Sequence, residues 1–147
     1  MTRRDWLLLL VALDGDRKGL DPIRIQKGLF LFAQEGALPA AESYWFTPYN
    51  YGPMSPGVYG DVEVSVRSGL LERRTVDGQS WRRVRATAHG HERASGLQAR
   101  AAGPDAAALD RLRAIRGLIV ELDFTRLLVT IYQRYPAYAV RSVFRRP

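Results

Sequence analysis

Cysteine is absent from the 147 residues of the chain, and histidine occurs only at His89 and His91. The absence of thiols excludes disulfide bonds, thiolate zinc sites and a cysteine nucleophile. The two histidines stand two positions apart, so on a helix they would face different directions, and no third ligand is near in sequence. We therefore expect neither a metal nor any other cofactor.

Long apolar runs are also missing. The run at residues 6–13 spans eight residues, whereas a membrane-spanning helix needs about 20. Asp5 interrupts the entry to this run, and Asp14 and Asp16 follow it where a signal peptide would need small residues. The run therefore predicts a buried first helix, and we expect the protein to be cytoplasmic.

The motifs of common catalytic sites are missing too. The sequence has no glycine-rich phosphate loop, no nucleophile elbow and no HExxH pattern, and its carboxylates are scattered singly. With 46% hydrophobic and 25% charged residues, the chain has the composition of an ordinary single-domain protein. The sequence thus predicts one structural unit that is not an enzyme.

Positive charge is concentrated in the second half of the chain. The net charge is +7, of which residues 1–64 carry −2, residues 65–100 carry +5 and residues 101–147 carry +4. A basic patch of this kind suits an anionic partner such as nucleic acid. However, 20 of the 22 basic residues are arginine, which a GC-rich genome also produces, so composition alone leaves both explanations open.

Capping residues followed by apolar periodicity predict the first three helices. Thr2 and Asp5 form a capping pattern ahead of the first. A cap followed by proline opens the other two, at residues 21–22 for a helix that runs to about residue 35 and at residues 55–56 for the third. The apolar positions of these two helices are Ile25, Leu29, Phe32, Val58, Val62 and Val66.

The region after the second helix contains the predicted strands. Residues 44–46 are aromatic and predict a short strand. Residues 70–76 and 81–86 predict a hairpin with a tight turn at Asp77 and Gly78, and alternation directs Val84 and Ala86 to the core. Thr87 then caps a fourth helix. This order of elements is that of a winged helix-turn-helix domain, which we place at residues 1–100.

Residues 101–147 are predicted to form a C-terminal helical extension. Its apolar residues recur at helical spacing and are Leu109, Leu112, Ile115, Ile119, Phe124, Leu127, Leu128 and Ile131. These helices must bury their apolar faces, either on the winged helix or against a second copy in a homodimer. The predicted fold class is therefore mainly α with a small β-hairpin: a winged helix-turn-helix plus a C-terminal helical extension, forming a single structural unit.

Several short motifs resemble a known family. They are IQKGLFL at residues 25–31, Phe46, YNYGP at 49–53, Ser55 and Tyr59, GLL at 69–71, and Tyr135, Pro136, Tyr138 and Ser142 near the end. With these motifs the chain resembles the YwgA-type winged-helix proteins of bacteria and archaea and, more distantly, SocA-like (Panacea) antitoxin domains. The resemblance implies a winged helix in a regulatory, antitoxin or phage-defence context, and no catalytic residue. Gly28 stands where a bulkier apolar residue is expected.

The predicted hairpin is the main candidate for contact with nucleic acid. Its arginines would grip phosphates, and Trp81 would stack or insert beside Arg83 and Arg85; the alternative is an edge hairpin kept soluble by its charge. The third helix is a poorer candidate, because its expected exposed residues include Asp61 and Glu63. The candidate nucleic-acid-binding residues are Arg67, Arg73, Arg74, Trp81, Arg82, Arg83 and Arg85.

The aromatic stretch at residues 44–53 is the second candidate surface. Trp45 and Phe46 are expected to fill the core. The candidate protein-binding residues are Tyr49, Tyr51, Pro53 and Tyr59.

The first hypothesis for function is a non-enzymatic DNA-binding transcription regulator, possessing a basic wing that holds the nucleic-acid backbone. The alternative is a protein-interaction module of the antitoxin or phage-defence accessory type.

Overall fold

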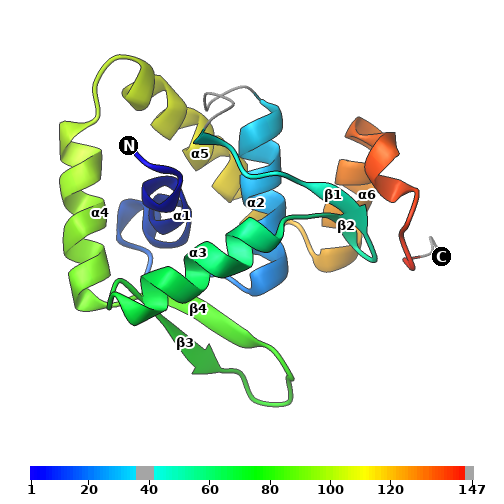
Figure 1. Ribbon diagram of the computed structural model, residues 1–147, viewed down its shortest axis with the longest axis horizontal. Coiled ribbons are helices and arrows are strands. Elements are labelled where there is room, and N and C mark those ends of the chain that lie inside the picture. The colour runs from blue at the N-terminus through cyan, green and yellow to red at the C-terminus, as the bar shows by residue number, and fades with distance from the viewer. Residues whose placement is uncertain (36–41, 145–147) are drawn as a thin grey trace.

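The computed structural model describes residues 1–35 and 42–144. The fold is mainly helical, as the sequence predicts, and two small antiparallel hairpins accompany the helices (Figure 1). The helices are α1 (Arg3–Ala12), α2 (Pro22–Gln34), α3 (Pro56–Arg67), α4 (Ala88–Arg100), α5 (Pro104–Glu121) and α6 (Phe124–Arg134), with 3-10 turns η1 (Leu13–Gly15) and η3 (Pro136–Ala139). The strands are β1 (Thr47–Tyr49), β2 (Gly52–Met54), β3 (Leu71–Thr75) and β4 (Arg82–Ala86).

The predicted helix caps lie where the sequence places them. Thr2 and Asp5 form a reciprocal capping box at α1, and the side chains of Asp21 and Thr87 accept backbone N–H bonds at the starts of α2 and α4. Ser55 stands at the N-cap of α3, but its side chain makes no capping bond. The boundary of α3 is therefore fixed by proline and by backbone contacts.

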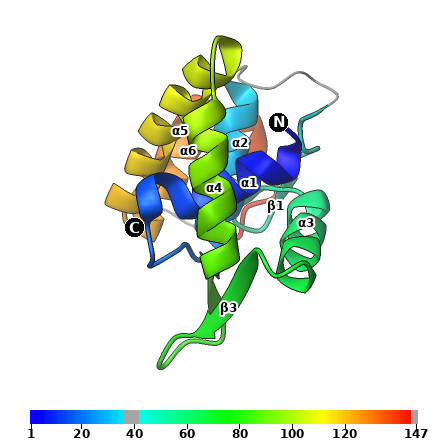
Figure 2. The same ribbon diagram turned by 90° about the vertical axis from the view of Figure 1, so that its left-hand side faces the viewer.

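The wing is the β3–β4 hairpin, which projects from the helical body in both views (Figures 1 and 2). Leu71 pairs with Ala86 at its base, and Thr75 pairs with Arg82 near its tip. Leu20, between α1 and α2, adds a third pairing, because its N–H and carbonyl both bond to Val84, at 2.8 and 2.9 Å. This short segment joins the wing to the helices.

The turn of the wing is wider than predicted. Strand pairing stops at Thr75 and resumes at Arg82, so residues 76–81 form the connecting loop. The turn at residues 77–78 is present inside this loop, since Gln79 N–H bonds to the Val76 carbonyl at 3.0 Å and Gly78 has a φ of 78°. Trp81 therefore lies in the loop, and strand alternation does not fix its orientation.

The predicted strand at residues 44–46 is wrong. Strand structure begins three residues later, in the β1–β2 hairpin, where Pro48 pairs with Pro53. Proline lacks the N–H that a ladder needs, which is why the sequence pattern did not indicate strands there. Tyr44 and Phe46 are instead buried: the Tyr44 hydroxyl donates to Asp61, and the Phe46 ring packs against Phe30.

The extension packs on the winged helix within the same chain. In α5, Leu112 and Ile119 are fully buried, and α5 lies along α2. Gly28 of α2 makes this approach possible, because a Cβ there would lie 2.9 Å from Ile119 Cδ1 and from Leu10 Cδ2. A bulkier side chain at position 28 would therefore have to displace Ile119 and Leu10.

Arginine side chains tie the extension to the first half of the chain. Arg24 donates to the carbonyls of Ile119 and Leu122, both at 2.8 Å, at the end of α5. Arg116 donates to the Leu10 carbonyl at 2.8 Å.

In the described part of the chain, no helix has both the length and the apolar sequence that crossing a bilayer requires.

Candidate nucleic-acid interface

Three arginines of α5 form ion pairs with acidic residues of the first half of the chain. Arg113 bonds to Asp14 at 2.8 Å, Arg116 pairs with Asp16, and Arg111 bonds to Glu35 at 3.1 Å. Acidic residues of the first half of the chain thus meet basic residues of the second half. The charge asymmetry seen in the sequence is in large part an intramolecular pairing, and the extension is a weak candidate for binding a polyanion.

The outer face of the wing keeps an excess of guanidinium groups. The register sets Glu72 opposite Arg85 and Arg74 opposite Arg83. Glu72 accepts from Arg85 at 2.7 Å and from Arg74 at 3.3 Å, and the hydrogen bond from Arg85 lowers the pKa of that carboxyl. Arg83 donates to the Gly19 carbonyl at 3.1 Å. This face therefore carries three arginines and one carboxylate, and the carboxylate bonds to only two of them.

The inner face of the wing turns toward α3. Arg73 forms an ion pair with Glu63 of α3 at 2.7 Å, and this hydrogen bond lowers the pKa of Glu63. Arg82 and Arg67 have no carboxylate within ion-pair distance among residues 1–35 and 42–144. The surface of the wing and α3 thus carries six arginines against three acidic residues, Glu63, Glu72 and Asp77, which leaves a net positive charge.

The acidity expected for the exposed side of α3 is smaller in the structure. Asp61 is only 8% exposed, accepting from Arg3 Nε at 2.9 Å and from the Tyr44 hydroxyl at 2.7 Å. Burial is the main cause that raises the pKa of Tyr44, so this hydroxyl stays protonated and donates to the carboxylate. The prediction that Asp61 is exposed was wrong. Glu63 is the acid left on this side, and Arg73 partly neutralises it.

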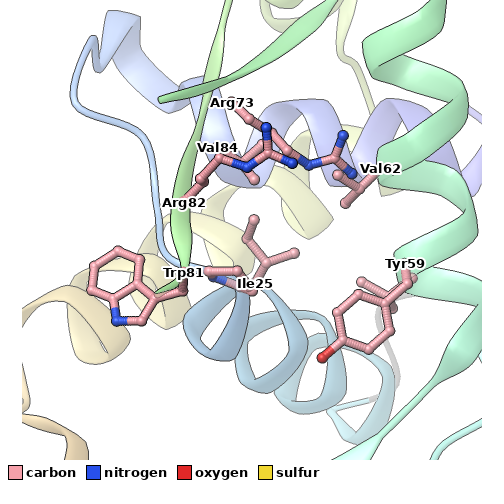
Figure 3. Close-up of a pocket in the computed structure, with 9 residues that line it drawn as sticks. Ile25, Tyr59, Val62, Arg73, Trp81, Arg82 and Val84 are labelled. Carbon is pink, nitrogen blue, oxygen red and sulfur yellow. The ribbon is translucent and has the colours of Figure 1, made fainter. Parts of the chain in front are cut away.

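A cleft of about 210 Å³ lies between α3, the wing and the start of α2. We call it the α3–wing cleft. Its apolar lining includes Ile25, Val62 and Val84. Figure 3 shows Trp81 and Tyr59 on opposite sides of Ile25, and the guanidinium groups of Arg73 and Arg82 close together along a third side. Several predicted site residues therefore meet here. The cleft itself was not predicted, because its walls come from three separate segments.

A clamp on α2 sets the position of α3. Gln26 Nε2 donates to the Ser55 carbonyl and Gln26 Oε1 accepts from the Ser55 N–H, both at 3.0 Å. Next to it, the buried Lys27 donates from Nζ to the Pro53 carbonyl at 2.9 Å. Burial lowers the pKa of Lys27 to about 8. The QK pair of the motif at residues 25–31 thus secures the segment that leads into α3.

Protein-family models give no match to the chain, and neither do the curated proteins. The geometry of the surface therefore has to indicate the function. No group of three or more His, Asp or Glu side chains in residues 1–35 and 42–144 has the arrangement of a metal site.

The aromatic stretch divides between core and surface. Phe46 is buried as expected, but Trp45 is 83% exposed, so its assignment to the core was wrong. Tyr49 and Tyr51 are 47% and 43% exposed, and the Tyr51 ring lies edge-on to Phe124 at 5.5 Å. Pro53 is buried, and its carbonyl accepts a hydrogen bond from Lys27. Pro53 therefore supports the hairpin and offers no surface to a partner.

Proposed function

We propose that this chain is a cytoplasmic, non-enzymatic winged-helix regulator that holds nucleic-acid backbone with its basic wing. The observation that carries this proposal is the distribution of charge. Arginines of the extension are paired with acids of the first half, whereas the projecting wing and α3 retain Arg67, Arg82 and Arg83 without a carboxylate partner in the described residues. The resemblance to YwgA-type proteins supports the same regulatory context.

In this proposal α3 enters the major groove and the wing follows the adjacent backbone. The half-exposed Tyr59 and the exposed Arg67 lie on the open side of α3. On the wing, Arg74, Arg83 and Arg85 point to one face, away from the buried Val84. Phosphate contacts of this kind hold the protein on the duplex and carry little sequence information.

A salt titration tests the proposal. If four arginines neutralise phosphates, the affinity for duplex DNA falls with a log–log slope of about −3.6. Arg83→Ala with Arg85→Ala should make that slope shallower by about 1.8. Arg126→Ala is the matched control, because this arginine is exposed and belongs to α6 and not to the wing. Affinity that does not change with salt, or a double variant that behaves as the wild type, would refute the wing model.

The exposed aromatic side chains support a second candidate function, a protein-interaction module of the antitoxin or defence-accessory type. Trp45, Tyr49 and Tyr51 offer aromatic surface of the kind that anchors interfaces. Tyr49→Ala with Tyr51→Ala should release a partner that co-purifies from the native host. A partner retained by this double variant would exclude the surface. A homodimer through the C-terminal helices would have to use the outer sides of α5 and α6, because Leu112 and Leu128 are buried within the chain.

A further inference from the structure

We propose that the α3–wing cleft binds an unpaired base of a nucleic-acid strand and that Arg82 holds the neighbouring phosphate. This inference rests on the proposed function, because the strand is brought to the cleft by the wing. It adds a second kind of contact. The wing arginines hold backbone whether or not the bases are paired, whereas the cleft accepts a base only when that base has left its stack.

The size and floor of the cleft fit one flat ring. Its volume of about 210 Å³ is below the roughly 300–1,000 Å³ of sites for drug-sized ligands. The floor is formed by Ile25, Val62 and Val84, which offer apolar contact and no hydrogen-bonding groups from their side chains. A planar heterocycle covers such a floor and is held there by exclusion of water.

One side wall is aromatic. Tyr59 stands on α3 and is 50% exposed, whereas Trp81 lies across the cleft in the loop before β4, and Figure 3 shows its indole pointing away from Ile25. Neither ring packs against another aromatic ring in the described part of the chain. Trp81 Nε1 donates to Gln79 Oε1 at 3.1 Å, which helps to orient the indole. The unstacked Tyr59 ring beside an apolar floor forms a platform for a base.

The charge at the rim selects an anionic ligand. The Arg73 guanidinium is held by Glu63, whereas Arg82 beside it has no carboxylate partner in residues 1–35 and 42–144. A free guanidinium at the rim of this cleft matches the phosphate that accompanies every base of a strand. A neutral aromatic side chain of a protein partner would fill the floor and leave this cation unused.

A free nucleotide carries the same ring and the same kind of charge, but a strand can also bind to the wing, which raises its affinity for the cleft. The wing arginines Arg74, Arg83 and Arg85 belong to the same hairpin as Arg82. A strand held by them presents its bases at high effective concentration, whereas a free nucleotide binds through the cleft alone. We therefore assign the cleft to a base within a strand.

Two duplexes of one sequence test the assignment, one fully paired and one with a single extrahelical 2-aminopurine. The wild-type protein should quench the 2-aminopurine fluorescence and bind the bulged duplex at least about fivefold more tightly than the paired one, from the stacking of one base. Tyr59→Ala should abolish that preference, and Tyr59→Phe should keep it, since stacking does not need the hydroxyl. Tyr49→Ala, an equally exposed tyrosine on the β1–β2 hairpin, is the matched control.

The outcomes separate this inference from the proposed function. Equal affinity for the paired and bulged duplexes, or a preference that survives Tyr59→Ala, overturns the cleft assignment and leaves the wing model standing. No binding to either duplex overturns both. Adenosine monophosphate alone is the third ligand. If it binds as tightly as the bulged duplex and loses affinity in Tyr59→Ala, the cleft belongs to free nucleotides and the assignment to a strand is wrong.

Discussion

Replacing Lys27 with methionine probes the clamp that positions α3. The ammonium group is buried on α2 with the Pro53 carbonyl as its hydrogen-bond partner, and burial lowers its pKa from 10.5 to about 8. At about 1.36 kcal/mol per pKa unit, the difference between folded and unfolded chain corresponds to about 3 kcal/mol. Folding therefore carries an unfavourable contribution from the charged form of this side chain.

The sign of the pH dependence follows from that direction. Below pH 8 the lysine is protonated in both states and the unfavourable contribution is complete. Between pH 8 and 10.5 the unfolded chain binds the proton more strongly, so the contribution declines as pH rises. Since methionine lacks this titration, the stability of the wild type relative to Lys27→Met should increase by about 3 kcal/mol across that window.

Urea unfolding at pH 7, 8, 9 and 10.5, followed by tryptophan fluorescence, measures the difference. Using the difference between two proteins removes the titration of groups that both share, such as Tyr44. Lys18→Met removes the other lysine and controls for the loss of a charge. A stability gap between wild type and Lys27→Met that is the same at pH 7 and pH 10.5 would refute the assignment of a buried lysine with a lowered pKa.

Three further predictions concern the wing surface and the core. Glu63→Gln releases Arg73 for phosphate, so a salt titration with duplex DNA should show tighter binding and a slope steeper by about 0.9; unchanged binding would show that Arg73 does not reach the backbone. Leu112→Ala, at the buried face of α5, should lower the free energy of unfolding by about 2–5 kcal/mol in urea titrations, whereas a loss below 1 kcal/mol would contradict the packing. Gly28→Leu should destabilise the chain by about 1–3 kcal/mol through overpacking against Ile119. A stabilised variant would show that position 28 has room for a bulkier side chain.

The local features of the fold were predictable because they depend on neighbours in sequence. Thr2, Asp21 and Thr87 were identified as caps because each acts within one helical turn. Apolar periodicity likewise identified the buried faces of α3 and α5, where Val58 and Leu112 are buried. These signals also determine the order of elements, which is what indicates a winged helix.

The errors concern residues whose surroundings are set by distant segments. Asp61 is buried because Arg3, 58 positions away, and Tyr44 neutralise and bond its carboxylate. Trp45 is exposed because its two aromatic neighbours take the inward positions. Helical or strand periodicity identifies an apolar face, but it does not identify which polar side chain finds a remote partner. The α3–wing cleft has the same origin, because its lining residues come from α2, α3 and the wing, which are distant in sequence.

The bonds from Arg24 to the end of α5 also bear on how the chain folds. The last carbonyls of a helix have no partner within it, and here the donors for Ile119 and Leu122 come from a residue 95 and 98 positions earlier. Contacts across so long a stretch form only after a large loss of chain entropy. The last turn of α5 therefore obtains these donors only from the folded chain, because no residue of its own neighbourhood in sequence supplies them.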